Sequence, residues 1–82
     1  MTLLKLRVVD AGAVERAHDL APALAELAHM PNPRRAERFQ TLAADLFAIA
    51  SLCDGPSGAE LAQRVVDEDG FAQKLSRELA SL

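Results

Sequence analysis

Hydrophobic residues recur every three or four positions along most of this chain, which is the spacing of amphipathic helices. Asp10 is a suitable N-cap, and the pattern after it predicts a helix within residues 10–30. Pro22 removes the backbone hydrogen bond to His18, so we expect a kink or a fresh helix start there. The expected inner face is rich in alanine and holds Val14, Ala17, Leu20, Ala21, Leu24, Leu27 and Ala28.

The "PNPRR" segment predicts a connection, with Asn32 as a cap and Pro33 at the first helical position. The next helix is expected over residues 34–52. Its first half carries a polar stripe that ends at Asp45, which we expect to face solvent or Arg38. Its second half, within "LFAIASLC", is apolar nearly all round, which predicts either a central helix buried on every side or a helix whose end lies in an interface.

Two further helices are expected in the C-terminal part. Ser57 followed by Glu60 matches a capping box ahead of an apolar stripe, so a helix should begin there. Gly70 should end that helix or form a tight turn. A last helix then uses Phe71, Leu75, Leu79 and Leu82 at helical spacing. Residues 1–82 are thus predicted to form a single small helical domain, with one strand followed by a bundle of about four helices.

The N-terminal segment "TLLKLRVVD" differs from the rest of the chain because its pattern is weakly alternating and rich in valine at its end. We predict a strand over about residues 2–9, within an N-terminal segment 1–10. A helical interpretation stays open, because leucine and lysine also favour helices. One face of the strand, with Leu4, Leu6 and Val8, should pack on the helices. No second strand is predicted, so its backbone would need a partner outside the chain.

Composition also favours a partner outside the chain. Of the 82 residues 16 are alanine and 3 are phenylalanine, the only aromatic type, so the core buries little area per residue. A thin core in a short chain favours completion by a partner or a second copy. The net charge of −3 disfavours non-specific binding to nucleic acid or anionic lipid. The bias toward alanine, arginine and aspartate is typical of GC-rich bacterial or phage genomes.

Catalytic, metal-binding and cofactor-binding sites are not predicted. His18 and His29 are eleven residues apart, roughly 16 Å along a continuous helix, and cannot share a metal ion there. Cys53, the single cysteine, ends an apolar helix and is interpreted as a buried structural thiol. No segment approaches the roughly 20 apolar residues of a membrane span, and the N-terminus is a poor signal peptide. We therefore expect a cytoplasmic, non-enzymatic protein.

A DNA-binding function is the alternative. Residues 60–79 have the spacing of a helix-turn-helix, whose second helix would present Gln73, Lys74 and Arg77 to a groove. Two features oppose this interpretation. The turn lacks the usual glycine and apolar residue after the first helix. It also carries three acidic residues, at positions 67–69, close to where phosphates would run.

The favoured prediction is a protein–protein interaction module, such as an adaptor, an assembly factor or a stoichiometric inhibitor. The partner is expected to be another protein chain, most simply a second copy that pairs with the N-terminal strand to form a homodimer. The expected interface residues are Leu4, Lys5, Leu6, Arg7 and Val8.

Overall fold

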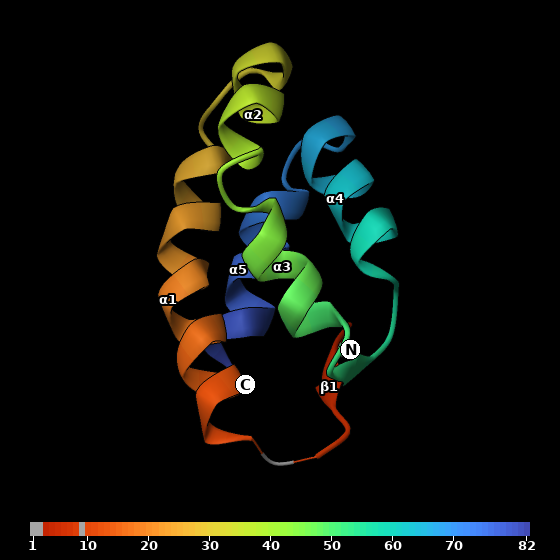
Figure 1. The fold of residues 1–82 in the computed structure, drawn as a ribbon. Coiled ribbons are helices and arrows are strands. Elements are labelled where there is room, and N and C mark those ends of the chain that lie inside the picture. The colour runs from red at the N-terminus through yellow and green to blue at the C-terminus, as the bar shows by residue number, and fades with distance from the viewer. Residues whose placement is uncertain (1–2, 9) are drawn as a thin grey trace.

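The computed structural model describes residues 3–8 and 10–82, and these ranges form five helices and two short strands (Figure 1). The elements in chain order are β1 (Lys5–Leu6), α1 (Ala11–Leu27), α2 (Asn32–Phe39), α3 (Ala43–Ala50), β2 (Cys53–Asp54), α4 (Gly58–Asp67) and α5 (Phe71–Ala80). The mainly helical class is confirmed, although the described residues contain one helix more than expected. Positions 2 and 9 of the predicted strand lie outside the described residues.

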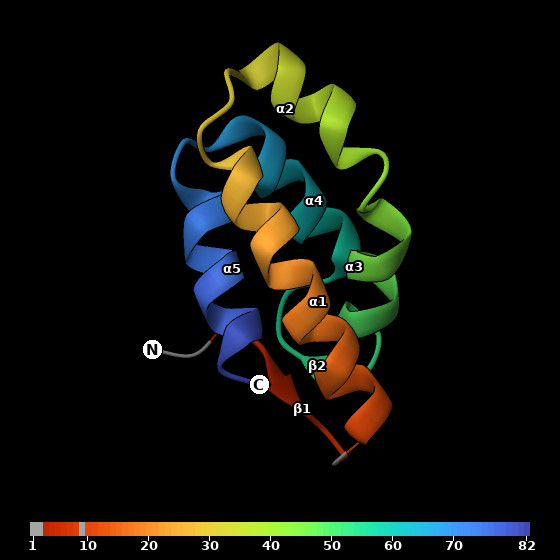
Figure 2. The ribbon, with the colours of Figure 1, turned by 90° about the vertical axis from the view of Figure 1, so that its left-hand side faces the viewer.

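The most extensive helix pair is α1 with α5, which lie side by side (Figure 2). Small buried residues line their contact, including Ala17 and Ala21 on α1 and Ala72 on α5. The buried Ser76 hydroxyl donates a hydrogen bond of 2.6 Å to the Ala21 carbonyl oxygen. Small side chains allow the two backbones to approach closely, as the alanine-rich face of the sequence predicts.

The single helix predicted over residues 34–52 is wrong, because this segment forms two helices. Phe39 ends α2 and is buried, and the chain then turns before α3 begins at Ala43. The turn is closed by the Thr41 hydroxyl, which donates to the Arg38 carbonyl oxygen at 2.8 Å. The break lets α2 lie across one end of the bundle while α3 runs along its side (Figure 1).

Of the two alternatives for the end of this segment, a central helix buried on every side within the chain is wrong. Leu46 and Ile49 are fully buried, whereas Phe47 is 45% exposed and Leu52 is 40% exposed. The helix α3 packs against α1 and α4 and leaves its third side open to solvent. The Phe47 ring lies against the backbone of Gly58, where an added Cβ would come within 2.2 Å of it.

Helix α1 runs through Pro22 without ending, so the expected fresh start is absent. Pro22 has no amide hydrogen to donate to the carbonyl oxygen of His18. Both residues are exposed, so this missing hydrogen bond lies on the solvent side of the helix. The predicted N-cap is confirmed, because the Asp10 carboxylate accepts hydrogen bonds from the amides of Gly12 and Ala13 at 2.9 and 3.2 Å.

The other predicted helix boundaries have mixed outcomes. The Ser57 hydroxyl caps α4 by accepting a hydrogen bond from the Glu60 amide at 3.2 Å. Gly70 forms the turn before α5 with a φ of 88°. Asn32 is not the cap of α2, because Pro31 holds that position and Asn32 lies inside the helix. Its side chain instead donates to the carbonyl oxygen of Val66 at 2.8 Å.

Candidate docking surfaces

The strand β1 has a partner inside the chain. It pairs antiparallel with β2, so that Lys5 lies opposite Asp54 and Leu6 opposite Cys53. The Arg7 amide extends the ladder by donating to the Leu52 carbonyl oxygen at 3.1 Å. The expectation that the chain lacks a second strand is therefore wrong. The pattern hid β2 because its residues follow an apolar helix directly and occupy only two positions.

One edge of β1 stays open. In an antiparallel ladder hydrogen-bonded and non-hydrogen-bonded pairs alternate, and the pair of Arg7 with Leu52 is hydrogen-bonded. The pair of Leu6 with Cys53 is then of the other kind, so the Leu6 amide and carbonyl point away from β2. Between described residues no strand pairs with that outer edge.

The predicted interface residues divide between core and surface. Leu4 is 1% exposed, and Leu6 is half-buried against the same core. Lys5 and Arg7 are exposed on the opposite face of the sheet, where the Arg7 guanidinium lies 3.8 Å from the Asp54 carboxylate and donates to the Ser51 carbonyl oxygen. The expectation that Val8 packs on the helices is wrong, since 74% of this residue is exposed.

Val8 lies beside the exposed Leu52, and the two line a hollow of about 560 Å³ together with Arg7, Asp10 and Ala11. We call Arg7, Val8 and Leu52, with the open edge of β1, the β1 surface. Leu52 was not a candidate from the sequence, because it ends a stretch whose apolar pattern indicates burial. Only the turn into β2 brings it out of the core and next to Val8.

A groove runs from this point between α1 and α3. Two adjoining hollows, of about 410 and 180 Å³, share Gly12 and Arg16 and together define the α1–α3 groove. Its lining residues are Asp10, Gly12, Ala13, Glu15, Arg16, Asp19, Leu20, Ala23, Leu42, Asp45, Ala48, Ile49 and Leu52. The groove exists because several facing residues are glycine or alanine and leave space unfilled. This abundance of small residues was the one signal of it in the sequence.

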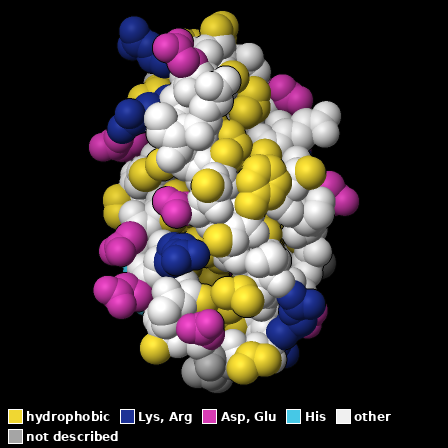
Figure 3. Space-filling view, viewed as in Figure 1, with side chains coloured by type: hydrophobic (Ala, Val, Ile, Leu, Met, Phe, Trp, Pro, Cys, Tyr) yellow, Lys and Arg dark blue, Asp and Glu magenta, His cyan; other side chains and the backbone are white. Residues whose placement is uncertain are grey.

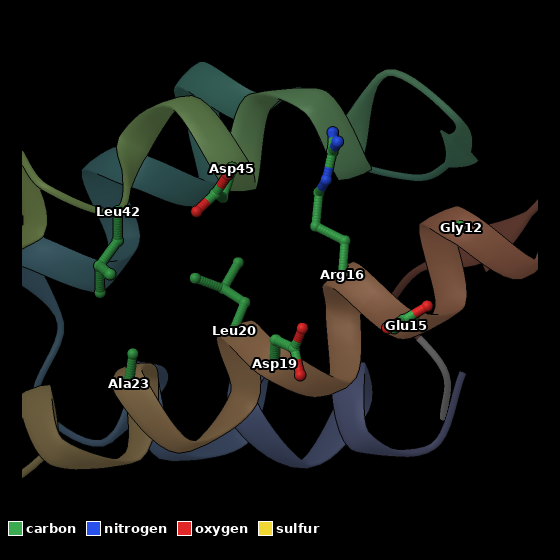
Figure 4. A pocket seen from close by; sticks show the side chains of 8 residues that line it. All are labelled: Gly12, Glu15, Arg16, Asp19, Leu20, Ala23, Leu42 and Asp45. Atoms are coloured by element: carbon green, nitrogen blue, oxygen red, sulfur yellow. The ribbon is translucent and has the colours of Figure 1, made fainter.

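The rim of the groove is mostly acidic. Arg16 and Leu20 from α1, and Leu42 and Asp45 from the α3 side, point into the space between the two helices (Figure 4). Glu15, Asp19 and Asp45 supply three carboxylates against the single guanidinium of Arg16. None of the ion pairs between described residues involves these four side chains. Asp45 is exposed, as expected, and lines this groove with Arg16.

The space-filling view shows the same surface from outside. Hydrophobic side chains form a broken strip down the middle of this face, and acidic side chains gather on the side of α1 (Figure 3). This face therefore combines apolar contact area with negative charge, which are the two features that a protein partner can recognise.

The candidates for metal and thiol chemistry are separated in the fold. His18 and His29 are exposed on α1 and in the turn that follows it, and the described residues contain no group of three or more possible metal ligands. Cys53 is buried in the core beside Leu4. Burial raises the pKa of the Cys53 thiol; nearby Arg7 lowers it and Asp54 raises it further. A thiol held in its protonated form is a poor nucleophile.

The residues of the DNA-binding alternative lie together on α5. Gln73, Lys74 and Arg77 line one shallow hollow, which Glu78 also lines. All three acidic residues of the preceding turn are exposed, and Asp69 forms an ion pair of 3.1 Å with Arg35. The carboxylates thus stand at the N-terminal end of the helix that would enter the groove, where they repel phosphates.

Comparisons with known proteins found no match for the chain. No protein-family model, no curated protein and no solved structure matches it. Among the described residues, none of the helices has both the length and the apolar character needed to cross a lipid bilayer.

Proposed function

We propose that this protein is a non-enzymatic protein–protein interaction module, an adaptor, assembly factor or inhibitor, that binds another chain at the β1 surface. The observation that carries the proposal is the pair of exposed apolar side chains, Val8 and Leu52, beside an open strand edge. An open edge supplies main-chain donors and acceptors for an added strand, and neighbouring apolar side chains supply contact area.

The energy available at this surface is modest. Complete burial of a valine or leucine side chain is worth about 1.5–3 kcal/mol. Because Val8 is 74% and Leu52 40% exposed, their burial by a partner would contribute about 2–3 kcal/mol together. Each main-chain hydrogen bond adds about 0.5–1.5 kcal/mol net. With the two hydrogen bonds that the Leu6 amide and carbonyl can make, the sum is about 4–5 kcal/mol, which corresponds to a dissociation constant between about 0.1 and 1 mM unless the complex buries further surface.

Self-association through β1 is the simplest form of this function. Two β1 strands pairing antiparallel about a two-fold axis at Leu6 would form a four-stranded sheet. Lys5 of one copy would then lie opposite Arg7 of the other, and like charges directly across a sheet are unfavourable. Asp54, beside both positions, offsets part of this repulsion. We therefore expect the homodimer to become tighter as salt screens these charges.

Sedimentation velocity of the full chain at high micromolar concentration tests this form. Replacing Val8 and Leu52 by serine should weaken the dimer about tenfold or more, as the loss of their burial implies. Phe47→Ser is the control, because Phe47 is similarly exposed but lies outside the β1 surface. A full chain that stays monomeric under these conditions would show that self-association through β1 is wrong.

The helix-turn-helix alternative makes the opposite prediction about salt. Binding of DNA through Lys74 and Arg77 should be lost steeply as salt rises, because counterions are released from the phosphates. Retention on DNA that is abolished by charge reversal at these two positions, with Val8 and Leu52 intact, would favour the regulator over the interaction module.

A further inference from the structure

The α1–α3 groove has a different character from the β1 surface. Its floor is apolar, with Leu20 and Ile49 at the bottom and Ala23 and Leu42 at one end. Its rims are formed by two helices, so no free strand edge runs along the groove. A trough of this kind accommodates a third helix, which buries one apolar face between the two existing helices.

The length of the groove sets the size of the matching segment. The central part of the floor, from Ala13 to Leu20, follows α1 for seven residues, which correspond to about 10 Å of helix axis, and Ala23 lies almost one turn further on. An occupant helix running along it presents apolar residues at positions i, i+4 and i+7, which span this central part. Two helical turns of contact therefore cover the central part of the groove.

The charges on the rims select the occupant. Glu15 and Asp19 lie on the α1 rim and Asp45 on the α3 rim, and none of them has an ion-pair partner among the described residues. Carboxylates on both sides of an apolar floor are complementary to an apolar stripe flanked by lysine or arginine. Arg16 lines both hollows and would repel a cation at the centre of the occupant helix. It therefore favours a neutral or acidic residue at the centre of that helix.

We propose that the α1–α3 groove is a docking site for a cationic amphipathic helix of another protein. Apolar residues of that helix contact the half-buried Ala23, Leu42 and Ala48, which lie over the buried Leu20 and Ile49, and its flanking cations pair with Asp19 and Asp45. The groove meets the β1 surface at Leu52, but its other end, with Ala23, Leu42 and Asp45, takes no part in strand pairing at β1. Docking at that end does not depend on self-association through β1.

A pair of synthetic peptides tests the proposal on the full chain. Each is a helical peptide of about 14 residues with leucine at i, i+4 and i+7, and it carries flanking lysines in one case and glutamates in the other. The lysine peptide should bind and the glutamate peptide should not. Amide chemical shifts should change along α1 and α3, centred on Leu20 and Ile49. Changes confined to residues 6–8, or equal binding of both peptides, would overturn the proposal.

Charge reversal on the rims provides the matched comparison. Asp19→Lys combined with Asp45→Lys turns two attractions into repulsions and should weaken binding of the lysine peptide about tenfold. Glu37→Lys with Asp67→Lys makes the same change in net charge on exposed residues outside the groove. This control should change the affinity by less than about twofold. An equal loss in both variants would mean general electrostatic attraction and would refute a docking site.

A second copy of the chain is the rival occupant of the groove. Sedimentation of the rim variant distinguishes it, because loss of self-association on Asp19→Lys/Asp45→Lys would assign the groove to a homodimer and overturn the proposal. Retained self-association together with lost peptide binding supports it. Val8 lines the β1 surface and not the groove, so a Val8→Ser variant that leaves the dimer intact counts against self-association at the β1 surface and not against docking in the groove.

Discussion

Replacement of the buried Arg35 tests how α2 is joined to the end of α4. Arg35 is 3% exposed and extends from α2 to the end of α4. Its Nε and Nη2 donate to the Val66 carbonyl oxygen at 3.1 and 2.5 Å, and its Nη1 donates to the Met30 carbonyl oxygen at 3.1 Å. Nη1 also lies 3.1 Å from the carboxylate of Asp69, which is 96% exposed.

Arg35→Met keeps the apolar stem and removes the donors. A hydrogen bond from a charged group is worth about 1.5–3 kcal/mol, but two donors of Arg35 share one oxygen that Asn32 also contacts, so the losses do not add fully. We expect a loss of about 3 kcal/mol in the free energy of unfolding, mainly from the unpaired Met30 carbonyl and the weakened contact to Val66. Such a loss corresponds to a fall in Tm of about 12–24 °C for a domain of this size.

Asp69→Ala is the comparison that separates the hydrogen bonds from the ion pair. Because the carboxylate is almost fully exposed, its loss should cost less than about 1 kcal/mol. Urea unfolding followed by far-UV circular dichroism measures both variants, since the chain has no tryptophan or tyrosine to report by fluorescence. The reasoning is refuted if Asp69→Ala costs as much as Arg35→Met, because the ion pair would then be the dominant contact.

Substitutions at three further positions test other parts of the fold. Gly55→Ala should lower the free energy of unfolding by about 1–3 kcal/mol, because Gly55 has a φ of 141° and an added Cβ would come within 2.3 Å of the Leu3 carbonyl oxygen. Loss of protection of the Arg7 amide in hydrogen exchange measures this effect. Asp10→Ala removes the cap of α1 and should cost about 1 kcal/mol in urea unfolding, whereas Asp10→Asn should retain most of it. The raised pKa of Cys53 means that the folded chain binds the thiol proton more tightly than the unfolded chain does, so the protonated thiol contributes to the free energy of unfolding. This contribution is complete below the ordinary thiol pKa of about 8.5, and it is lost as the pH rises through the pKa of the folded state. Cys53→Ala should remove that loss in unfolding curves between neutral and alkaline pH, and an unchanged pH dependence would contradict the assignment.

The helical part of the fold could be predicted from local patterns. The caps at Asp10 and Ser57 and the turn at Gly70 depend on residues within a few positions of one another, and they are where the sequence indicates. The break between Phe39 and Ala43 could not be predicted in this way. Nothing in the residues around Gln40 forbids a helix, and the division follows from packing α2 across the end of the bundle and α3 along its side.

The candidate surfaces show the same division. The sequence correctly places Leu4 on the face of the N-terminal segment that packs on the core, because alternation is a local property. It fails at Val8 and Leu52, whose apolar character indicates burial although both are exposed. Periodicity reports how apolar a face is, and exposure depends on whether another element is available to cover that face.

The sequence by itself determined the class of this protein, most helix boundaries and the alanine-rich inner face of α1, because these depend on side-chain type and on spacing along one helix. Tertiary structure alone decided the partner of β1, which is more than 45 residues away in the chain at Cys53. It also decided that the small residues of α1 and α3 face each other across an unfilled groove with an acidic rim. Pairings between distant segments depend on which apolar side chains the whole fold buries against one another, and a local sequence pattern does not show which these are.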